Sequence, residues 1–432
     1  MPSTSNASAG TAVAEPPERP AAVEEQLLDR TLRARRPARG GGAGMGVGSG
    51  AGVTPPEEFE GVPCDAAAEI GAAHAASEAA QREAQEREPE FSASWADNPS
   101  AFQAAYRAAR ERRARGEAAV EFMTDDATGG LGARQGGRAF GVEIEFDVAP
   151  GIDRHQALAA IGRDLHAAGL TNSPEQRGYH ARPSDSAAGL WRFEADSTVA
   201  GEIVSPIAYD EPRTWAQLAQ VCEIVRRHGG VATQRTGGHV HVGVGDYDHT
   251  VGNHNNLLAM FQAHEDVLYR LAQNPTQRQH RGTDWCAPNR VPAAPYFDPH
   301  SVRYANQSHR IGVNFQSVSG RTTDHVEFRM WDSSLDPGVI QAQVKLSLGM
   351  AHAAFRSRGE RWAQREPIGA HRTRNASLGR GRRLRGDAWQ ADTASFRQLV
   401  DRIFTRDQDR AQATALLVNP SMPHSVLYDI FV

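Results

Sequence analysis

The sequence predicts an α+β fold in which a mainly antiparallel sheet carries helices on its back. From residue 137 onward, short segments that alternate apolar and polar residues are interspersed with longer segments whose apolar residues recur at helical spacing. The predicted order of elements is β-α-β-β-α-β-α-β-β-α. Its strands come in hairpin-like pairs, which favours antiparallel pairing. No internal repeat is evident in the sequence.

The chain ahead of this region divides into two parts. Residues 1–62 are rich in Ala, Gly, Pro and Arg and nearly free of aromatic residues, so we expect a disordered arm. Its glycine-rich run lacks the lysine of a phosphate loop and indicates a flexible linker. Residues 63–130 are expected to form a helical extension, with helices over 65–90 and 100–122. A run of arginines at 107–115 could contact nucleic acid or an acidic partner, although a solvated helix face is the commoner explanation.

Residues 137–356 are expected to form the main domain. The Pro- and Asn-rich stretch at 274–306 is long for a loop, which makes it a candidate lid. Residues 357–432 are expected to form a linker, arginine-rich over 372–385, and a tail with one or two helices between 394 and 418. The expected strands of the main domain are 138–146, 190–196, 201–205, 236–243, 310–315 and 325–331, and its expected helices are 153–170, 213–228, 253–272 and 339–355.

Composition narrows the class of protein. A formal net charge of −5 gives no reason to expect nucleic acid as a partner. Three scattered cysteines favour a reducing compartment over a disulfide framework. No apolar run is long enough to cross a bilayer, so we expect a cytoplasmic protein without a membrane partner. Lys345 is the single lysine, which excludes most lysine-based catalysis.

Three predicted strands place two ionisable residues two positions apart, with apolar residues between them. Side chains alternate faces along a strand, so both members of each pair point the same way. If the strands share one sheet, all six groups line one face, and crowded carboxylates there would repel one another. A divalent cation would neutralise them. The three pairs are Glu143/Glu145, His239/His241 and Glu327/Arg329.

Further residues extend this set. Glu202 lies between a glycine and two β-branched residues, and Asp196 precedes it. A site of several carboxylates and one imidazole suits Mg²⁺ or Mn²⁺ better than structural zinc. Arg310 and Arg329 would then supply fixed positive charge for a phosphoryl group or a carboxylate. Each motif also has an ordinary structural explanation. The acid pairs could lie on a solvated face, and Glu327 and Arg329 could form a salt-bridge ladder across the sheet. Asp196 could belong to a plain turn.

The same residues carry a resemblance to a known family. The motifs are Gly141-Val142-Glu143-Ile144-Glu145-Phe146, Asp196-Ser197 with Gly201-Glu202-Ile203-Val204-Ser205-Pro206, Gly238-His239-Val240-His241-Val242-Gly243, Arg310 with Asn314, and Glu327-Phe328-Arg329 closing on Asp332-Ser333. In this order they resemble the amidoligase family of the carboxylate–amine ligase superfamily, which includes glutamine synthetase and glutamate–cysteine ligase. The resemblance covers about residues 137–356.

This resemblance implies a curved antiparallel sheet that holds ATP and Mg²⁺, with Mn²⁺ as an alternative. It implies metal ligands at Glu143, Glu145, Glu202, His239 and Glu327. It places His241, Asn314 and Arg329 at the nucleotide, Arg310 and Arg329 at the transferring phosphate or acyl-phosphate, and Asp196 at the metal site or the amine.

The implied reaction joins a carboxylate to an amine through an acyl-phosphate, giving an amide, ADP and phosphate. The substrates are expected to be amino acids, peptides or other small carboxylates and amines, and the arm could recruit a protein partner. Three alternatives stay open: a phosphotransferase of the same fold, a metal-dependent hydrolase, and a non-catalytic partner-binding protein.

Overall fold

A computed structural model describes a large part of the chain, all of it within the unit Asp65–Val432. The predicted arm (1–62), the predicted helix at 65–90 and the arginine-rich linker (372–385) lie outside the described residues. The described residues are 93–118, 120–123, 138–179, 185, 188–247, 251–274, 286–287, 289, 296, 298–319, 324–356 and 386–418, with 386–391 described by their backbone alone.

The described strands form one sheet in the order β2-β3-β1-β5-β7-β6, and β4 pairs with the end of β1. Every pair of strands among the described residues is antiparallel. Together with the helices, this sheet confirms the predicted α+β class. The strands are β1 (Phe140–Val148), β2 (Arg192–Glu194), β3 (Gly201–Val204), β4 (Gly230–Val231), β5 (Gly237–Gly243), β6 (Val313–Asn314) and β7 (His325–Asp332).

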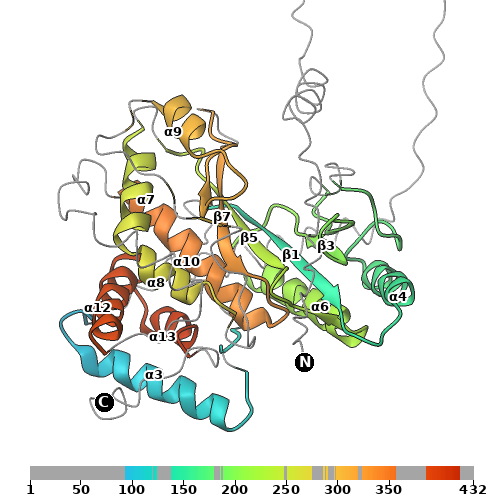
Figure 1. Ribbon diagram of the computed structural model, residues 1–432, viewed down its shortest axis with the longest axis horizontal. Helices are drawn as coiled ribbons and strands as arrows, with labels where there is room; N and C mark the ends of the chain where they lie inside the picture. Colours follow the sequence, from blue (N-terminus) through green and yellow to red (C-terminus); the bar gives the residue numbers. More distant parts are fainter. Residues whose placement is uncertain are drawn as a thin grey trace, which may run out of the picture. The chain divides into compact units, whose positions relative to one another are not determined.

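Helix α10 is the central helix of the described structure and contacts β1 and β5 as well as α6, α7, α12 and α13. Figure 1 shows it beside the strands, between α7 and α8 on one side and α6 on the other. The helices are α3 (Pro99–Ala114), α4 (Arg154–Ala167), α6 (Pro212–Arg227), α7 (Gly252–Ala263), α8 (Glu265–Leu271), α9 (Pro299–Ala305), α10 (Pro337–Arg356), α12 (Gly386–Ile403) and α13 (Asp407–Ala415).

The alternation in β1 produces the two faces of the sheet. Val142, Ile144 and Phe146 are buried in the hydrophobic core. Phe140, on the same side of β1, stacks on Trp215 of α6 with ring centroids 5.5 Å apart. The apolar residues of β1 therefore face the helices, and Glu143 and Glu145 face the opposite way.

A bulge in β7 changes which residues face the helices. Gly238 pairs with Trp331 and Val240 with Phe328, so two residues of β7 lie opposite His239 alone. Strict alternation would place Trp331 on the face of Glu327. The bulge instead allows the indole Nε1 of Trp331 to donate to Ser347 Oγ on α10, at 3.1 Å.

Several predicted helix limits were wrong. The helix expected over 100–122 ends at Ala114, and Gly116 follows it with φ +75°. A helix, α9, lies inside the predicted loop at 274–306, where Asp298 and Ser301 form a capping box ahead of it. The strand expected over 310–315 is shorter and comprises only β6; just ahead of it, Gly312 lies so close to Tyr269 that a Cβ would be 2.6 Å from the phenol oxygen.

The helix expected over 253–272 is divided at His264, whose φ of −113° separates α7 from α8. The His264 side chain is buried and bonds through Nδ1 to Ser395 Oγ of α12 at 2.8 Å. Burial, together with the positive charge of Arg402, lowers the pKa of His264 to about 4.

The buried His264 predicts an acid-labile fold. In the unfolded chain the imidazole takes up a proton near pH 6.5, but in the folded chain it does so only near pH 4. Stability is therefore unaffected above pH 6.5 and falls as the pH drops from 6.5 to 4, by up to about 3 kcal/mol. Urea unfolding of the wild type and His264→Gln across this range measures the effect. Parallel curves for the two proteins would contradict it.

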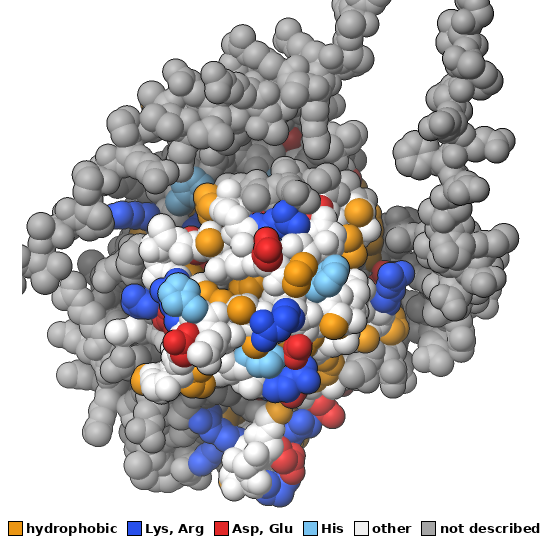
Figure 2. Space-filling view, turned by 90° about the vertical axis from the view of Figure 1, so that its right-hand side faces the viewer, with side chains coloured by type: hydrophobic (Ala, Val, Ile, Leu, Met, Phe, Trp, Pro, Cys, Tyr) orange, Lys and Arg blue, Asp and Glu red, His pale blue; other side chains and the backbone are white. Residues whose placement is uncertain are grey.

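The segment ahead of α3 and the C-terminal helices contact one another. The indole Nε1 of Trp95 donates to Asp407 at 2.8 Å, and its backbone amide donates to Asp401 at 2.9 Å. Helix α13 contacts both α3 and α10, and Phe102 and Tyr106 are buried in the common core. None of the described helices has the length and apolar character needed to cross a membrane. On the face in Figure 2, acidic, basic and histidine side chains are interspersed among the described residues.

Candidate active site

The sheet register brings the predicted ionisable residues to one face. Glu143 lies opposite His239 on the neighbouring strand, and His241 lies opposite Glu327. On the other side of β1, Glu145 lies opposite Glu202. Residues that are far apart in the sequence therefore converge on the face of the sheet that points away from the apolar core.

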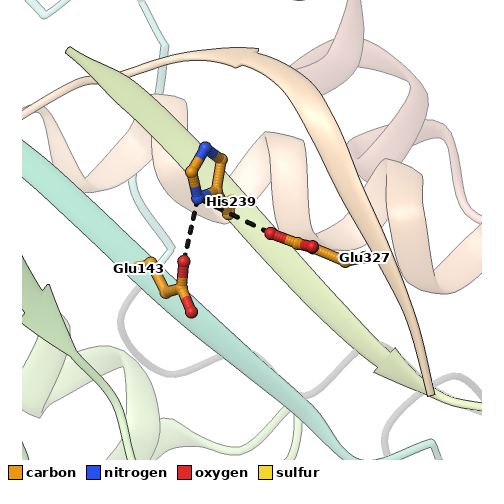
Figure 3. A group of neighbouring side chains, drawn as sticks. All are labelled: Glu143, His239 and Glu327. Carbon is orange, nitrogen blue, oxygen red and sulfur yellow. Dashed lines mark hydrogen bonds and ion pairs between the residues drawn. The ribbon is translucent and has the colours of Figure 1, made fainter. Parts of the chain in front are cut away.

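His239 lies at the centre of this group. Its Nδ1 is 2.8 Å from Glu143 Oε2 and 3.7 Å from Glu327 Oε1, and its Nε2 is 3.8 Å from Glu145 Oε1. Figure 3 shows the imidazole between the carboxyl groups of Glu143 and Glu327, which come from the strands on either side. A buried histidine with acids around both ring nitrogens joins the two halves of the site.

His241 lies on the same face, one alternation further along β5. Its Nε2 is 3.0 Å from Glu143 Oε1 and 3.9 Å from Glu327 Oε1. Burial acts to lower the pKa of His241, but the two carboxylates outweigh it and raise the pKa to about 8. Burial acts to raise the pKa of Glu143, yet His241 and His239 hold that pKa well below its usual range. The pKa of Glu327 is lowered against burial in the same way, chiefly by His241 and Arg329.

Glu145 and Glu202 form the other half of the site. Glu145 Oε2 accepts a hydrogen bond from the Gly237 amide at 2.6 Å. Glu202 is 5% exposed, and no hydrogen bond or ion pair joins its carboxyl group to another described residue. Burial, followed by the charges of Glu143 and Glu145, raises the pKa of Glu202 to about 10. The ionised form of a buried carboxyl group is costly unless a cation compensates its charge.

The donor atoms fit a divalent cation. Two groups each bring one donor atom per residue to within 4.8 Å of one another: Glu143, His239 and Glu327 form one, and Glu145, Glu202 and His239 form the other. Four carboxylates and one imidazole are a donor set for Mg²⁺ or Mn²⁺, which favour oxygen ligands. The lack of a hydrogen-bond or ion-pair partner for Glu202 among the described residues supports the same fit.

Of the other predicted site residues, Asn314 and Arg329 contact Glu327, whereas Asp196 lies in a turn and Arg310 is exposed. Asn314 donates through Nδ2 to Glu327 at 3.1 Å, and Arg329 pairs through Nη1 with Glu327 and donates through Nε to the His309 carbonyl at 2.8 Å. Asp196 is half-buried and accepts from Thr198 in a turn, which was one of its two expected roles. Arg310 is exposed, and no ion pair joins its side chain to the site acids within the described ranges.

Four residues of this face were not predicted from the sequence. The rings of His325 and His241 have centroids 5.3 Å apart. The side chain of Tyr179 is 59% exposed, and its pKa is raised by partial desolvation and by the acids Glu202, Glu143 and Asp196. Arg192 and Glu194 on β2 form an ion pair. This last pair repeats the two-residue spacing of the other strands, and that spacing was the signal that could have identified it.

The fold therefore combines an antiparallel sheet with a face lined by acids and histidines, which is a candidate site for divalent cations. The sequence profile of a family described as "Putative amidoligase enzyme" matches residues 136–351, which is half of the chain. The chain belongs to this amidoligase family, whose name denotes enzymes that form amide bonds.

Two solved structures resemble the chain at low identity. One is the complex between the prokaryotic ubiquitin-like protein Pup and its ligase PafA, with 12% identity, a TM-score of 0.36, and coverage of 65% of this chain and 62% of that chain. The other is a complex of GmaS with ADP, with 14% identity, a TM-score of 0.32, and coverage of 64% and 67%. The chain thus spans less than two thirds of the first structure's chain. A search of curated proteins finds no match.

Proposed function

We propose that the protein is an ATP- and Mg²⁺-dependent carboxylate–amine ligase that forms an amide through an acyl-phosphate. The observation that carries this proposal is the convergence of four glutamates and His239 on one sheet face, with Glu202 buried and uncompensated. Membership of the amidoligase family supports the amide-forming class.

The site residues would act by binding and orienting. Glu143, Glu145, Glu202, Glu327 and His239 would hold the cations. When bound, Mg²⁺ would screen the negative charge of the ATP phosphates and so favour phosphoryl transfer.

Arg329 is fixed in place by two contacts, one with Glu327 and one with the His309 carbonyl. Its guanidinium would neutralise charge on the transferring phosphoryl group while a substrate carboxylate oxygen attacks the γ-phosphorus and ADP leaves. His241, less buried than His239, would contact the nucleotide together with Asn314. Arg310 would also contact the phosphate or acyl-phosphate; its side chain is exposed, and no ion pair joins it to the site acids within the described ranges.

Asp196 would bind the amine. Both hydrogen bonds from Thr198 go to its Oδ1, which leaves Oδ2 able to accept a proton or a hydrogen bond from an incoming amine. The amine nitrogen attacks the carbonyl carbon of the acyl-phosphate, phosphate leaves with the carbon–oxygen electron pair, and the nitrogen loses a proton.

An ADP-release screen tests the proposal. The full chain is incubated with Mg·ATP and pooled amino acids and peptides as both carboxylates and amines, with Glu143→Ala as the inactive control. We expect ADP release that requires both kinds of substrate. Cleavage of a substrate without any nucleotide would contradict a ligase. ADP release that requires a guanidino acceptor would indicate a phosphotransferase.

A further inference from the structure

Strand β2 carries a buried ion pair beside the acid cluster. Arg192 Nη1 lies 2.6 Å from Glu194 Oε1, and the two side chains are 14% and 0% exposed. The two residues are two positions apart on one strand, so both lie on the same face of the sheet. Glu194 is opposite Glu202 in the register, which places the pair on the face that carries the site.

The register also places three glutamates in a row on adjacent strands. Glu194 on β2 lies opposite Glu202 on β3, and Glu202 lies opposite Glu145 on β1. Like charges directly opposite one another destabilise a sheet. Within the described structure only the outer member of the row, Glu194, has an arginine in contact with it, and Glu202 in the middle has none. The positive charge is thus placed one strand away from the carboxyl group that lacks compensation.

Stability alone gives little reason for such a pair. The loss of solvation that accompanies burial of two charges offsets most of their attraction, and an apolar pair in their place is often as stable. Neither candidate cation group includes Glu194, because its donor atoms are not among those that converge within 4.8 Å. Its charge still lies one strand from Glu202, where it would attract a cation without contacting it.

We propose that Arg192 and Glu194 are a positioning pair that sets the divalent-cation affinity of the Glu145, Glu202 and His239 group. The inference rests on the proposed function, since it concerns the cations of that same site. Glu194 strengthens cation binding through its charge. Arg192 weakens it through the opposite charge and keeps the Glu194 carboxylate from turning toward the cation, which confines binding to Glu145, Glu202 and His239.

The two charges predict effects of opposite sign on Mn²⁺ binding. Mn²⁺ is titrated without nucleotide into the full chain and followed by the electron paramagnetic resonance of the free ion. Glu194→Gln keeps the shape of the side chain and removes its charge, so we expect about tenfold weaker binding. Arg192→Gln is expected to bind Mn²⁺ several-fold more tightly. The double variant, whose net charge equals that of the wild type, is expected to bind within about twofold of the wild type.

Matched variants separate this role from a structural one. Arg192→Lys keeps the charge and should restore wild-type affinity. Arg138→Gln removes another buried, acid-paired arginine, which contacts Asp246 and the Gly243 carbonyl, and should leave Mn²⁺ affinity unchanged. Thermal unfolding with and without Mn²⁺ gives a second readout. Arg192→Gln removes the positive charge paired with Glu194 and should gain more in melting temperature from Mn²⁺ than the wild type does.

The outcomes distinguish this inference from the proposed function. If the wild type binds Mn²⁺ and both single variants weaken binding alike, or neither changes it, the positioning role is overturned and the metal-dependent ligase stands. If the wild type binds no Mn²⁺, both are overturned. Opposite shifts with recovery in the double variant support the inference whether or not a substrate has been found.

Discussion

Replacing Glu143 with alanine is expected to lower ADP-forming activity by about a thousandfold or more, which corresponds to about 4 kcal/mol of transition-state stabilisation. The carboxylate of Glu143 contacts both histidines of the site, with Oε2 on His239 and Oε1 on His241. Its loss removes one cation ligand and releases both imidazoles from their orienting partner. Mg·ATP binding by calorimetry and ADP release by a coupled assay measure the two consequences.

A matched control separates this effect from a general loss of charge. Glu223 is an exposed glutamate of α6 that pairs with Arg226, so Glu223→Gln should retain Mg·ATP binding and ADP release. Glu327→Ala should resemble Glu143→Ala, because Glu327 belongs to the same candidate cation group. If both alanine variants left Mg·ATP binding and the cellular phenotype unchanged, the result would indicate a partner-binding protein rather than an enzyme.

Replacing Asp409 with alanine is expected to reduce the free energy of unfolding by about 3–5 kcal/mol. Lys345, the single lysine of the sequence, is 1% exposed on α10, and its Nζ lies 3.0 Å from Asp409 Oδ1 on α13. Without Asp409 the buried ammonium group would lose the carboxylate that lies against it in the core, and weakening the compensation of a buried charge is among the most costly single changes. Urea unfolding monitored by tryptophan fluorescence measures the loss.

Replacing the lysine instead of the acid should cost less stability. Arg406 also contacts Asp409, with Nη2 and Nε each 2.9 Å from the carboxylate. In Lys345→Met the acid therefore keeps a positive partner, while the methionine fills much of the buried lysine stem's volume. We expect Lys345→Met to lose less stability than Asp409→Ala. Equal losses would show that the ion pair acts as a unit and that Arg406 does not compensate.

Local patterns in the sequence were sufficient to predict the centre of the fold. The alternation around Glu143 and Glu145, and around His239 and His241, predicts β1 and β5 because side-chain direction in a strand depends only on position. The same alternation predicts β7 up to Phe328. Once these strands are neighbours, their ionisable pairs must share a face, so the core of the candidate site followed from the sequence.

Features that depend on contacts between distant segments could not be predicted in this way. The break at His264 depends on Ser395 of α12, and the bulge that redirects Trp331 depends on the packing of α10 against the sheet. Arg310 shares the charge of Arg329, but only Arg329 lies on a strand that faces the acids. The register that places Glu194 next to Glu202 is a property of the folded sheet.

In the proposed reaction, this sheet face activates a carboxylate by phosphorylation. Transfer of ¹⁸O tests it most directly: a carboxylate substrate labelled with ¹⁸O is supplied with Mg·ATP and an amine, and the inorganic phosphate formed is analysed by mass spectrometry. An acyl-phosphate requires one carboxylate oxygen to leave with the phosphate, so we expect one ¹⁸O in each phosphate released. Unlabelled phosphate formed alongside the amide would contradict it.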